Sequence, residues 1–176
     1  MRTITVKELA APTGYDLKIA AGETLDLKSQ GTVTMPTGSI LQVVESQMEG
    51  STVTTTSSSF VATGHSVTIT PSLTSSKILL QIQGGGSYLP QANTMARVTI
   101  YRGSTNIGHS SKGLESHYTV GSTGFTVAPH AMGILDSPST TSAITYQAYM
   151  KTDGGTFQYQ ANDRGIISFI AMEVAG

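Results

Sequence analysis

Residues 143–160 read AITYQAYMKTDGGTFQYQ and contain the clearest hairpin pattern of the chain. Ile144, Tyr146, Ala148 and Met150 alternate with more polar neighbours, and side chains of a strand alternate between its two faces. The Asp153-Gly154-Gly155 segment then supplies residues that tolerate the positive φ of a tight turn. The stretch therefore predicts two antiparallel strands, each with one buried face.

Similar strand signals occur along most of the chain, and turn residues separate them. No stretch shows helical periodicity over ten or more residues. Many short strands at this spacing are typical of a sandwich, so we expect an all-β, antiparallel, jelly-roll-like sandwich. The other expected strands are residues 39–48, 59–64, 65–71, 76–83, 94–103 and 166–175.

Two regions are expected to be turns or loops. Gly84-Gly85-Gly86 follows a strand and predicts a wide turn, because no helix opening with Lys-Ser/Thr follows as in a phosphate-binding loop. The stretch 104–136 holds His109, His117, Tyr118 and His130 among Gly and Ser and predicts long loops. Binding residues are concentrated in such loops.

Residues 15–46 repeat with a period of eight: YDLKIAAG, ETLDLKSQ, GTVTMPTG and SILQVVES. Each octet carries apolar residues at its third and fifth positions, which predicts short strands with one dry face. These apolar residues are too few to build a core, so the rest of the chain or neighbouring copies must cover them. The pairs are Leu17/Ile19, Leu25/Leu27, Val33/Met35 and Leu41/Val43.

Two interpretations of the octets remain. One is a meander of hairpins on an ordinary β domain, and the favoured one is a threefold shaft or arm that makes the protein a homotrimer. The fourth octet fits better as the first strand of the sandwich. We expect residues 1–38 to form a repeated-strand segment for attachment and trimerisation, and residues 39–176 to form the sandwich.

Composition narrows the class of protein. Charged residues make up 12% of the 176 residues, whereas Ser and Thr number 21 and 26. This hydroxyl-rich surface is typical of extracellular or virion β proteins. Basic residues are scattered and the net charge is −1, so nucleic-acid binding is not expected. No apolar run suits an export signal or a membrane span, and there is no cysteine. We therefore expect a protein that is carried on a particle and not inserted in a membrane.

The chemistry-bearing residues do not form a recognisable motif. His109 and His117 lack metal-ligand spacing and are expected on surface loops, His65 is expected at a strand edge, and a His₃ site on a threefold axis is the alternative. The GSTGF segment at 121–125 lacks the serine and the strand-to-helix context of a nucleophile elbow. The sequence thus predicts no enzyme, no catalytic residue, no cofactor and no metal site within one chain.

Several segments resemble a recurrent structural, tail-fibre-like domain of marine bacteriophages, including those of cyanobacteria. They are TMPTGSILQVVES, SSSFVATGHSVTITPSLTSSKILLQIQ, RVTIYRGSTNIG and the terminal SFIAMEVAG, and the resemblance covers Thr34 to Gly176. The resemblance implies a homotrimeric virion component with a jelly-roll-like head. It implies no ligand residues.

Three functions follow as hypotheses. The favoured one is a trimeric fibre-like appendage that attaches to other virion proteins, of the tail or capsid, and touches a host-surface glycan or protein. The second is a capsid decoration (cement) protein, and the third is a glycan-binding or glycan-cleaving domain. In the first two the protein is assembled in the host cytoplasm and exposed on the particle. The expected trimerisation residues are Leu17, Ile19, Leu25, Leu27, Val33 and Met35, and the expected receptor contacts are Tyr88, His117 and Tyr118.

Overall fold

The computed structural model describes residue 21 and residues 35–121, 126–161 and 164–176. The chain divides into units Met1–Thr34 and Met35–Gly176, and the described β structure belongs to the second. Five of the six expected trimerisation residues (Leu17, Ile19, Leu25, Leu27 and Val33) lie outside the described residues. Their role, and a boundary after residue 38, stay predictions.

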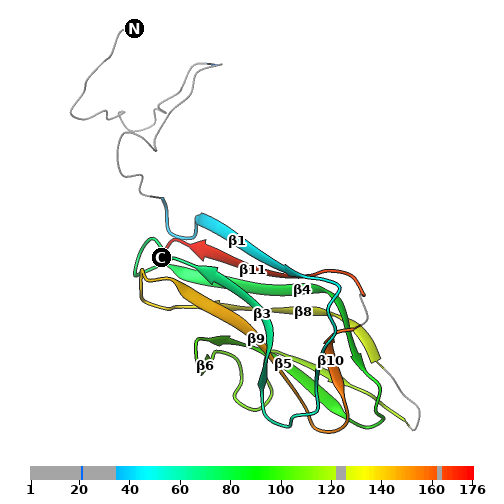
Figure 1. Cartoon of the computed structure of the whole chain (residues 1–176). Coiled ribbons are helices and arrows are strands. Elements are labelled where there is room, and N and C mark those ends of the chain that lie inside the picture. The colour runs from blue at the N-terminus through cyan, green and yellow to red at the C-terminus, as the bar shows by residue number, and fades with distance from the viewer. Residues whose placement is uncertain (1–20, 22–34, 122–125, 162–163) are drawn as a thin grey trace, which may run out of the picture. The chain divides into compact units, whose positions relative to one another are not determined.

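The strands of the second unit form two antiparallel sheets (Figure 1). Sheet A contains β1 (Ile40–Met48), β11 (Ile167–Val174), β4 (Lys77–Leu89) and β8 (Thr126–Asp136). The short β10 (Phe157–Gln160) pairs with β4 beyond the beginning of β11, and β2 (Val53–Thr55) pairs with β10. Sheet B contains β3 (Val61–Ile69), β9 (Ile144–Thr152) and β5 (Met95–Arg102), and β7 (Glu115–Tyr118) and β6 (Thr105–Asn106) pair with the first and the last part of β5, respectively.

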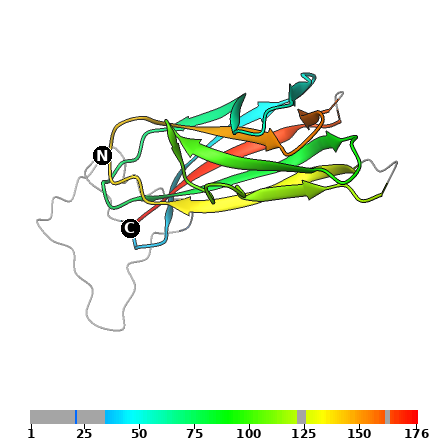
Figure 2. The same ribbon diagram turned by 90° about the horizontal axis from the view of Figure 1, so that it is seen from below.

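The order of the longer strands is that of a jelly roll. Sheet A runs β1-β11-β4-β8 and sheet B runs β3-β9-β5-β7, so each sheet interleaves strands from both ends of the chain. This order results when two Greek keys wind around one another. Strands of both sheets run roughly along one direction (Figure 2). The predicted all-β jelly-roll-like sandwich is confirmed.

Alternating strands bury one face each and form the core between the sheets. In β9 every second residue from Ile144 to Thr152 is buried, and in β11 every second residue from Ile167 to Glu173. Burial of large apolar side chains drives this packing, at about 1.5–3 kcal/mol for each. The largest fully buried side chains are Tyr146, Tyr159, Phe157, Phe169, Ile69, Ile78, Leu80, Ile82, Leu89, Ile100, Met150 and Ile167.

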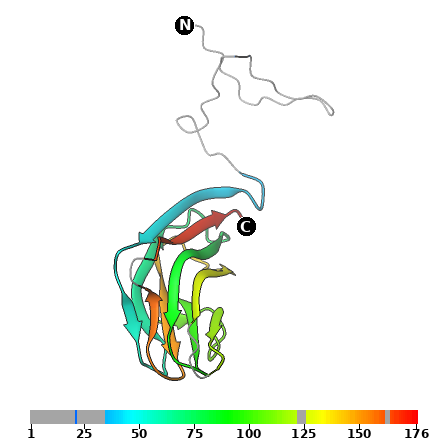
Figure 3. The same cartoon turned by 90° about the vertical axis from the view of Figure 1, so that its right-hand side faces the viewer.

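The two ends of the sandwich differ in what they hold. At the entry end, Gly38 N–H donates to the Ala175 carbonyl, and Ile40 pairs with Val174, so β1 begins beside the end of β11 (Figure 3). At the distal end β4 finishes against β8 at Leu89. Because β1 and β11 are joined at the entry end, the distal loops are formed by the interior of the chain.

The fourth octet is the first strand of the sandwich, as expected, but its dry face differs from the prediction. Val44 and Met48 pack against the core, whereas Val43 points outward and is 57% exposed. A register irregularity between Ile40 and Gln42 precedes this alternation. Val43 therefore does not face the core of its own chain, and Leu41, the other member of the apolar pair, is half-buried within the register irregularity.

Other strand predictions need correction. Residues 59–64 and 65–71 form one strand, β3, and β4 continues through the triple glycine, which is not a turn. Gly84 and Gly85 have positive φ within a register irregularity, and a Cβ on Gly84 would lie 2.6 Å from the Ile166 carbonyl. These glycines permit both the local backbone and the close approach of the neighbouring segment.

The stretch 104–136, expected to be loop, contains β6, β7 and the 11-residue β8. Pro129 and Gly133 lie within β8, and both weaken a strand signal. They are tolerated because β8 is an edge strand that pairs with β4. Within the part of the chain that the structure describes, no helix is long and apolar enough to cross a membrane.

Candidate functional site

The structure separates the predicted contact residues. Tyr118 is 50% exposed on sheet B, and Tyr88 is half-buried on sheet A, where it pairs with Val127. Both lie at the distal end. His117 is only 6% exposed, so its prediction as a receptor contact is wrong. Its ring points inward because its strand position pairs with the buried Ala96. Met35, the one described trimerisation residue, is 45% exposed.

His117 instead belongs to a cluster with Glu115 and His130 at the open side of the sandwich. Glu115 and His117 lie two residues apart on β7, so both point inward from the edge of sheet B. His130 points inward from β8, at the edge of sheet A, and β7 and β8 lie against each other. The cluster therefore spans the gap between the two sheet edges.

Gly113 brings β7 into place. Its φ is +69°, and a Cβ there would lie 2.4 Å from the Val98 carbonyl oxygen. That oxygen accepts a hydrogen bond from Leu114 N–H at 2.8 Å. Only glycine fits this approach without strain, and Glu115 follows directly.

Glu115 is the centre of the cluster. Its Oε2 lies 2.6 Å from His130 Nδ1 and 3.3 Å from His117 Nε2, and its Oε1 accepts from Ala131 N–H at 3.0 Å. Burial raises the pKa of Glu115, but hydrogen bonds and charge from His117 and His130 outweigh it and lower the pKa to about 2. Glu115 is therefore a carboxylate at neutral pH.

The polar network continues through the core. His130 Nε2 lies 2.9 Å from the Tyr159 carbonyl, and the Tyr159 hydroxyl lies 3.0 Å from His65 Nδ1. His65 Nε2 lies 3.0 Å from the Ser46 carbonyl, on β1. Burial, followed by the charge of Glu115, raises the pKa of Tyr159, and burial lowers the pKa of His65. His65 is thus a buried member of a cross-sheet network in the middle of β3, and its prediction as an edge residue that opens a strand is wrong.

This cluster was not predicted from the sequence, because its three residues do not have the spacing of a known metal-binding or catalytic motif. His130 lies thirteen residues after His117, on the opposite sheet. The one usable signal was Glu115 and His117 at alternate positions, which share a strand face. Because β8 was not predicted, the sequence offered no reason to place His130 beside Glu115 and His117.

A second buried carboxylate, Glu173, differs in its surroundings. It accepts hydrogen bonds from Gln42 Nε2, from both N–H and Oγ of Ser72, and from Ser76 Oγ, at 2.6–2.7 Å. Burial raises the pKa of Glu173, and these hydrogen bonds lower it to about 2. Through these hydrogen bonds, Glu173 on β11 connects to Gln42 on β1 and to Ser72 and Ser76 in the β3–β4 loop.

The outer face of sheet A carries an apolar row that crosses four strands. Val43 pairs with Met172, Met172 with Leu79, and Leu79 with Leu135. Val43 and Leu135 are 57% and 50% exposed. On β11, Ile170 and Val174 flank Met172 on the same outer face, two residues before it and two residues after it. We call Val43, Met172, Leu79 and Leu135 the apolar row.

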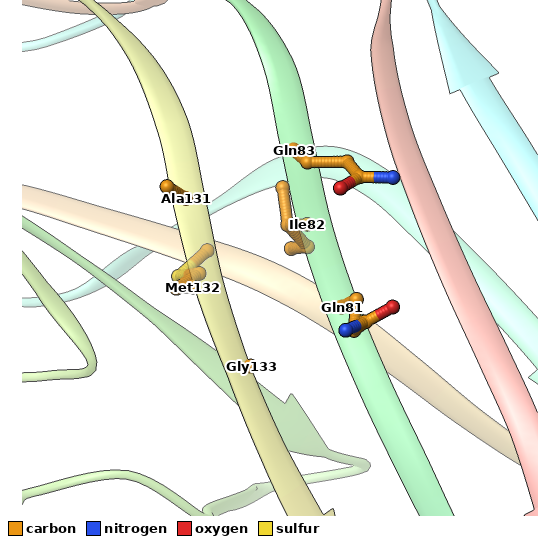
Figure 4. A pocket seen from close by; sticks show the side chains of 6 residues that line it. All are labelled: Gln81, Ile82, Gln83, Ala131, Met132 and Gly133. Carbon is orange, nitrogen blue, oxygen red and sulfur yellow. The ribbon is translucent and has the colours of Figure 1, made fainter.

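A shallow hollow of about 270 Å³ adjoins this row between β4 and β8 (Figure 4). Gln81 and Gln83 line it from β4, whereas Ala131 and Gly133 line it from β8. The hollow exists because the two β8 residues that face outward there have little or no side chain. Amide groups are thus available beside an apolar surface.

The outer face of sheet B is polar. Thr68 and Thr145 pair across β3 and β9 and share a hydrogen bond of 2.8 Å, and Arg97 forms an ion pair with Asp153. Tyr101 and Tyr149 stack with centroids 3.9 Å apart. The side chains on the outer face of sheet B therefore interact with one another or with water.

Comparisons with known proteins give distant similarities of fold. No family model and no curated protein matches the chain. Among solved structures, the VP2 subviral particle of infectious bursal disease virus is similar, with 14% identity, a TM-score of 0.42, and coverage of 94% of this chain and 41% of that chain. The structure of the Gt strain of that virus shows 14% identity and a TM-score of 0.38, with coverage of 95% and 47%. The chain spans less than half of either. The jelly-roll assignment rests on this chain's own strand pairing.

Proposed function

We propose that the chain is a structural, non-catalytic protein of a bacteriophage particle that assembles with copies of itself into a trimeric, fibre-like appendage. The observation that carries the proposal is the apolar row on the outer face of sheet A. Among the described residues, Val43 and Leu135 are left exposed and Leu79 and Met172 partly exposed, and contiguous exposed apolar surface marks interaction sites. The row itself contains no charge, so identical faces meet without repulsion.

The two ends of the sandwich fit this role. We assign attachment to other virion proteins to residues 1–38, which precede β1 in the sequence. The distal end carries exposed residues that suit contact with a host-surface glycan or protein: Tyr118, Val120 and Val127, which are 50%, 75% and 40% exposed. Tyr118 is the contact residue that this proposal keeps.

Size-exclusion chromatography with light scattering tests the assembly directly. We expect the full chain to have the mass of three chains at micromolar concentration, and a monomer at every concentration would contradict the proposal. Deletion of residues 1–38 is expected to remove the protein from particles.

Copy number on purified particles then distinguishes the appendage from a capsid decoration protein. Quantitative mass spectrometry should give on the order of a dozen or a few dozen copies for an appendage, whereas several hundred copies would establish the decoration role. Both roles use the same outer face of sheet A.

A further inference from the structure

The hydrogen-bond partners of His130 and His117 fix which ring nitrogens carry protons. His130 Nε2 faces the Tyr159 carbonyl, which only accepts, so Nε2 must carry hydrogen. The Ser87 hydroxyl donates to the Ala128 carbonyl at 2.9 Å, so its oxygen can only accept from His117 Nδ1, 3.5 Å away. In the neutral form of each ring, the remaining lone pairs lie on His130 Nδ1 and His117 Nε2.

Without a bound ion, the contact between His130 Nδ1 and Glu115 Oε2 is a hydrogen bond in which Nδ1 must donate, because the carboxylate only accepts. His130 Nδ1 lies 2.6 Å and His117 Nε2 lies 3.3 Å from the same carboxylate oxygen. His117 Nε2 is buried and has no hydrogen-bond partner among the described residues, since its contact with Glu115 lacks hydrogen-bond geometry. A metal ion can replace the proton on His130 Nδ1, and His130 Nδ1, His117 Nε2 and the Glu115 carboxylate then supply three electron pairs to one point.

We propose that Glu115, His117 and His130 bind one divalent transition-metal ion of the Zn²⁺ class, which joins the edge of sheet B to the edge of sheet A. Two imidazole nitrogens and one carboxylate oxygen are a donor set that suits Zn²⁺ and Co²⁺ and disfavours Ca²⁺, which prefers oxygen ligands. Glu115 supplies the negative charge that neutral imidazoles lack.

The geometry of the three donors is close to that of a metal site. The ligand atoms all lie within 4.8 Å of one another. Tetrahedral coordination at 2.0–2.2 Å separates ligand atoms by about 3.2–3.6 Å, which the His117–Glu115 distance of 3.3 Å already matches. The His130–Glu115 distance must widen by less than about 1 Å, which rotation of the Glu115 carboxyl group provides.

The second layer of contacts also has the form found around bound metals. Metal-ligating histidines usually donate their other N–H to a carbonyl or another oxygen, which orients the ring. The Tyr159 carbonyl does this for His130, and Ser87 Oγ for His117. The side chain of Glu115 is 12% exposed, so an ion reaches the site past this residue. We expect a structural ion that fastens the open side of the sandwich.

Metal titration of the full, untagged chain tests the proposal. The protein is stripped with a chelator, dialysed, and titrated with Zn²⁺ in competition with a chromophoric chelator, and in parallel with Co²⁺ followed by visible absorption. We expect one ion per chain and a thermal midpoint raised by about 5–10 °C at a free Zn²⁺ concentration 100 times the dissociation constant. Ca²⁺ at the same concentration should not change the midpoint.

Matched variants locate the ion. His130→Gln and His117→Gln should weaken Zn²⁺ binding at least 10-fold and abolish the Co²⁺ spectrum. His109→Gln, at an exposed loop position, should bind as the wild type does. Circular dichroism checks that each variant folds, and Glu115→Gln replaces either histidine variant that does not fold. Failure to bind one Zn²⁺ per chain, or equal affinity in the cluster variants, would overturn the proposal. Neither result bears on the trimer, which light scattering measures separately.

Discussion

The outer face of sheet A carries an apolar row across four strands, whereas the outer face of sheet B carries hydroxyl groups, an ion pair and stacked tyrosines. The inner faces of the two sheets are alike, since both are lined by large apolar side chains. Folding of one chain therefore explains the inner faces and leaves the difference between the outer faces unexplained. Under the proposed function, the outer face of sheet A is the face that meets another copy of the chain.

The largest expected effect comes from a charge placed in the middle of the apolar row. Leu79→Lys should weaken self-assembly at least 100-fold, because a charged side chain would be buried between copies. Thr145→Lys is the matched control on a central strand of sheet B and should leave the assembly constant unchanged within about threefold. Light scattering over a concentration series measures both, and equal effects of the two variants would contradict the comparison.

The inner face of sheet A offers a contrast in which folding is affected but the assembly surface is not altered. Glu173→Ala removes the acceptor of four hydrogen bonds and leaves the buried Ser76 hydroxyl without it, so we expect it to lower the free energy of unfolding by about 1.5–3 kcal/mol. Urea unfolding measures this loss. At urea concentrations below its unfolding midpoint, the variant should still assemble. Loss of assembly in the folded variant would show that the inner face of sheet A also affects assembly.

The same carboxylate gives a pH dependence. Because the pKa of Glu173 is lowered from 4.5 to about 2, its stabilising effect is present above about pH 4.5 and is lost as pH falls toward 2. The difference in unfolding free energy between the wild type and Glu173→Gln should therefore be constant above pH 5 and shrink between pH 4.5 and 2. A difference that does not change over this range would show that the charge of Glu173 contributes nothing.

The strand that carries Glu115 should depend on Gly113. Gly113→Ala places a Cβ against the Val98 carbonyl at positive φ, and we expect it to cost about 1–3 kcal/mol and to weaken Zn²⁺ binding. Gly103→Ala is the control, since Gly103 also has positive φ but no atom within 4 Å of its added Cβ. A smaller loss in Gly103→Ala, measured by urea unfolding, would separate close approach from backbone strain.

The smallest effect is expected at the edge of the apolar row. Val43→Thr keeps the shape of the side chain and replaces one methyl group by a hydroxyl, so it should weaken assembly by about 3–10-fold and change folding by less than about 0.5 kcal/mol. Light scattering and urea unfolding measure these two quantities. An effect as large as that of Leu79→Lys would place the centre of the interface nearer β1.

The sequence predicts the sandwich well where strands alternate without interruption. β5, β9 and β11 lie within a residue or two of their expected bounds, because each has a regular apolar alternation and ends in turn residues. β8 was missed because Pro129 and Gly133 interrupt its pattern, and only its position at a sheet edge makes them acceptable.

The candidate sites were harder to predict, because both depend on strand order and register. Val43 and Met172 are far apart in sequence and become neighbours only through the pairing of β1 with β11. A shift of one residue would turn either of them to the other face. His130 likewise meets Glu115 and His117 only because the edges of β7 and β8 close the same side of the sandwich.

Thiol labelling tests the difference between the two outer faces most directly, because the chain contains no cysteine. Leu135→Cys places one thiol in the apolar row, and Thr145→Cys places one on the outer face of sheet B. In dilute protein both thiols should react rapidly. At concentrations where light scattering shows assembly, we expect labelling of Leu135→Cys to slow at least 10-fold while Thr145→Cys is unchanged. Equal protection of both thiols, or protection of Thr145→Cys alone, would contradict assembly through sheet A.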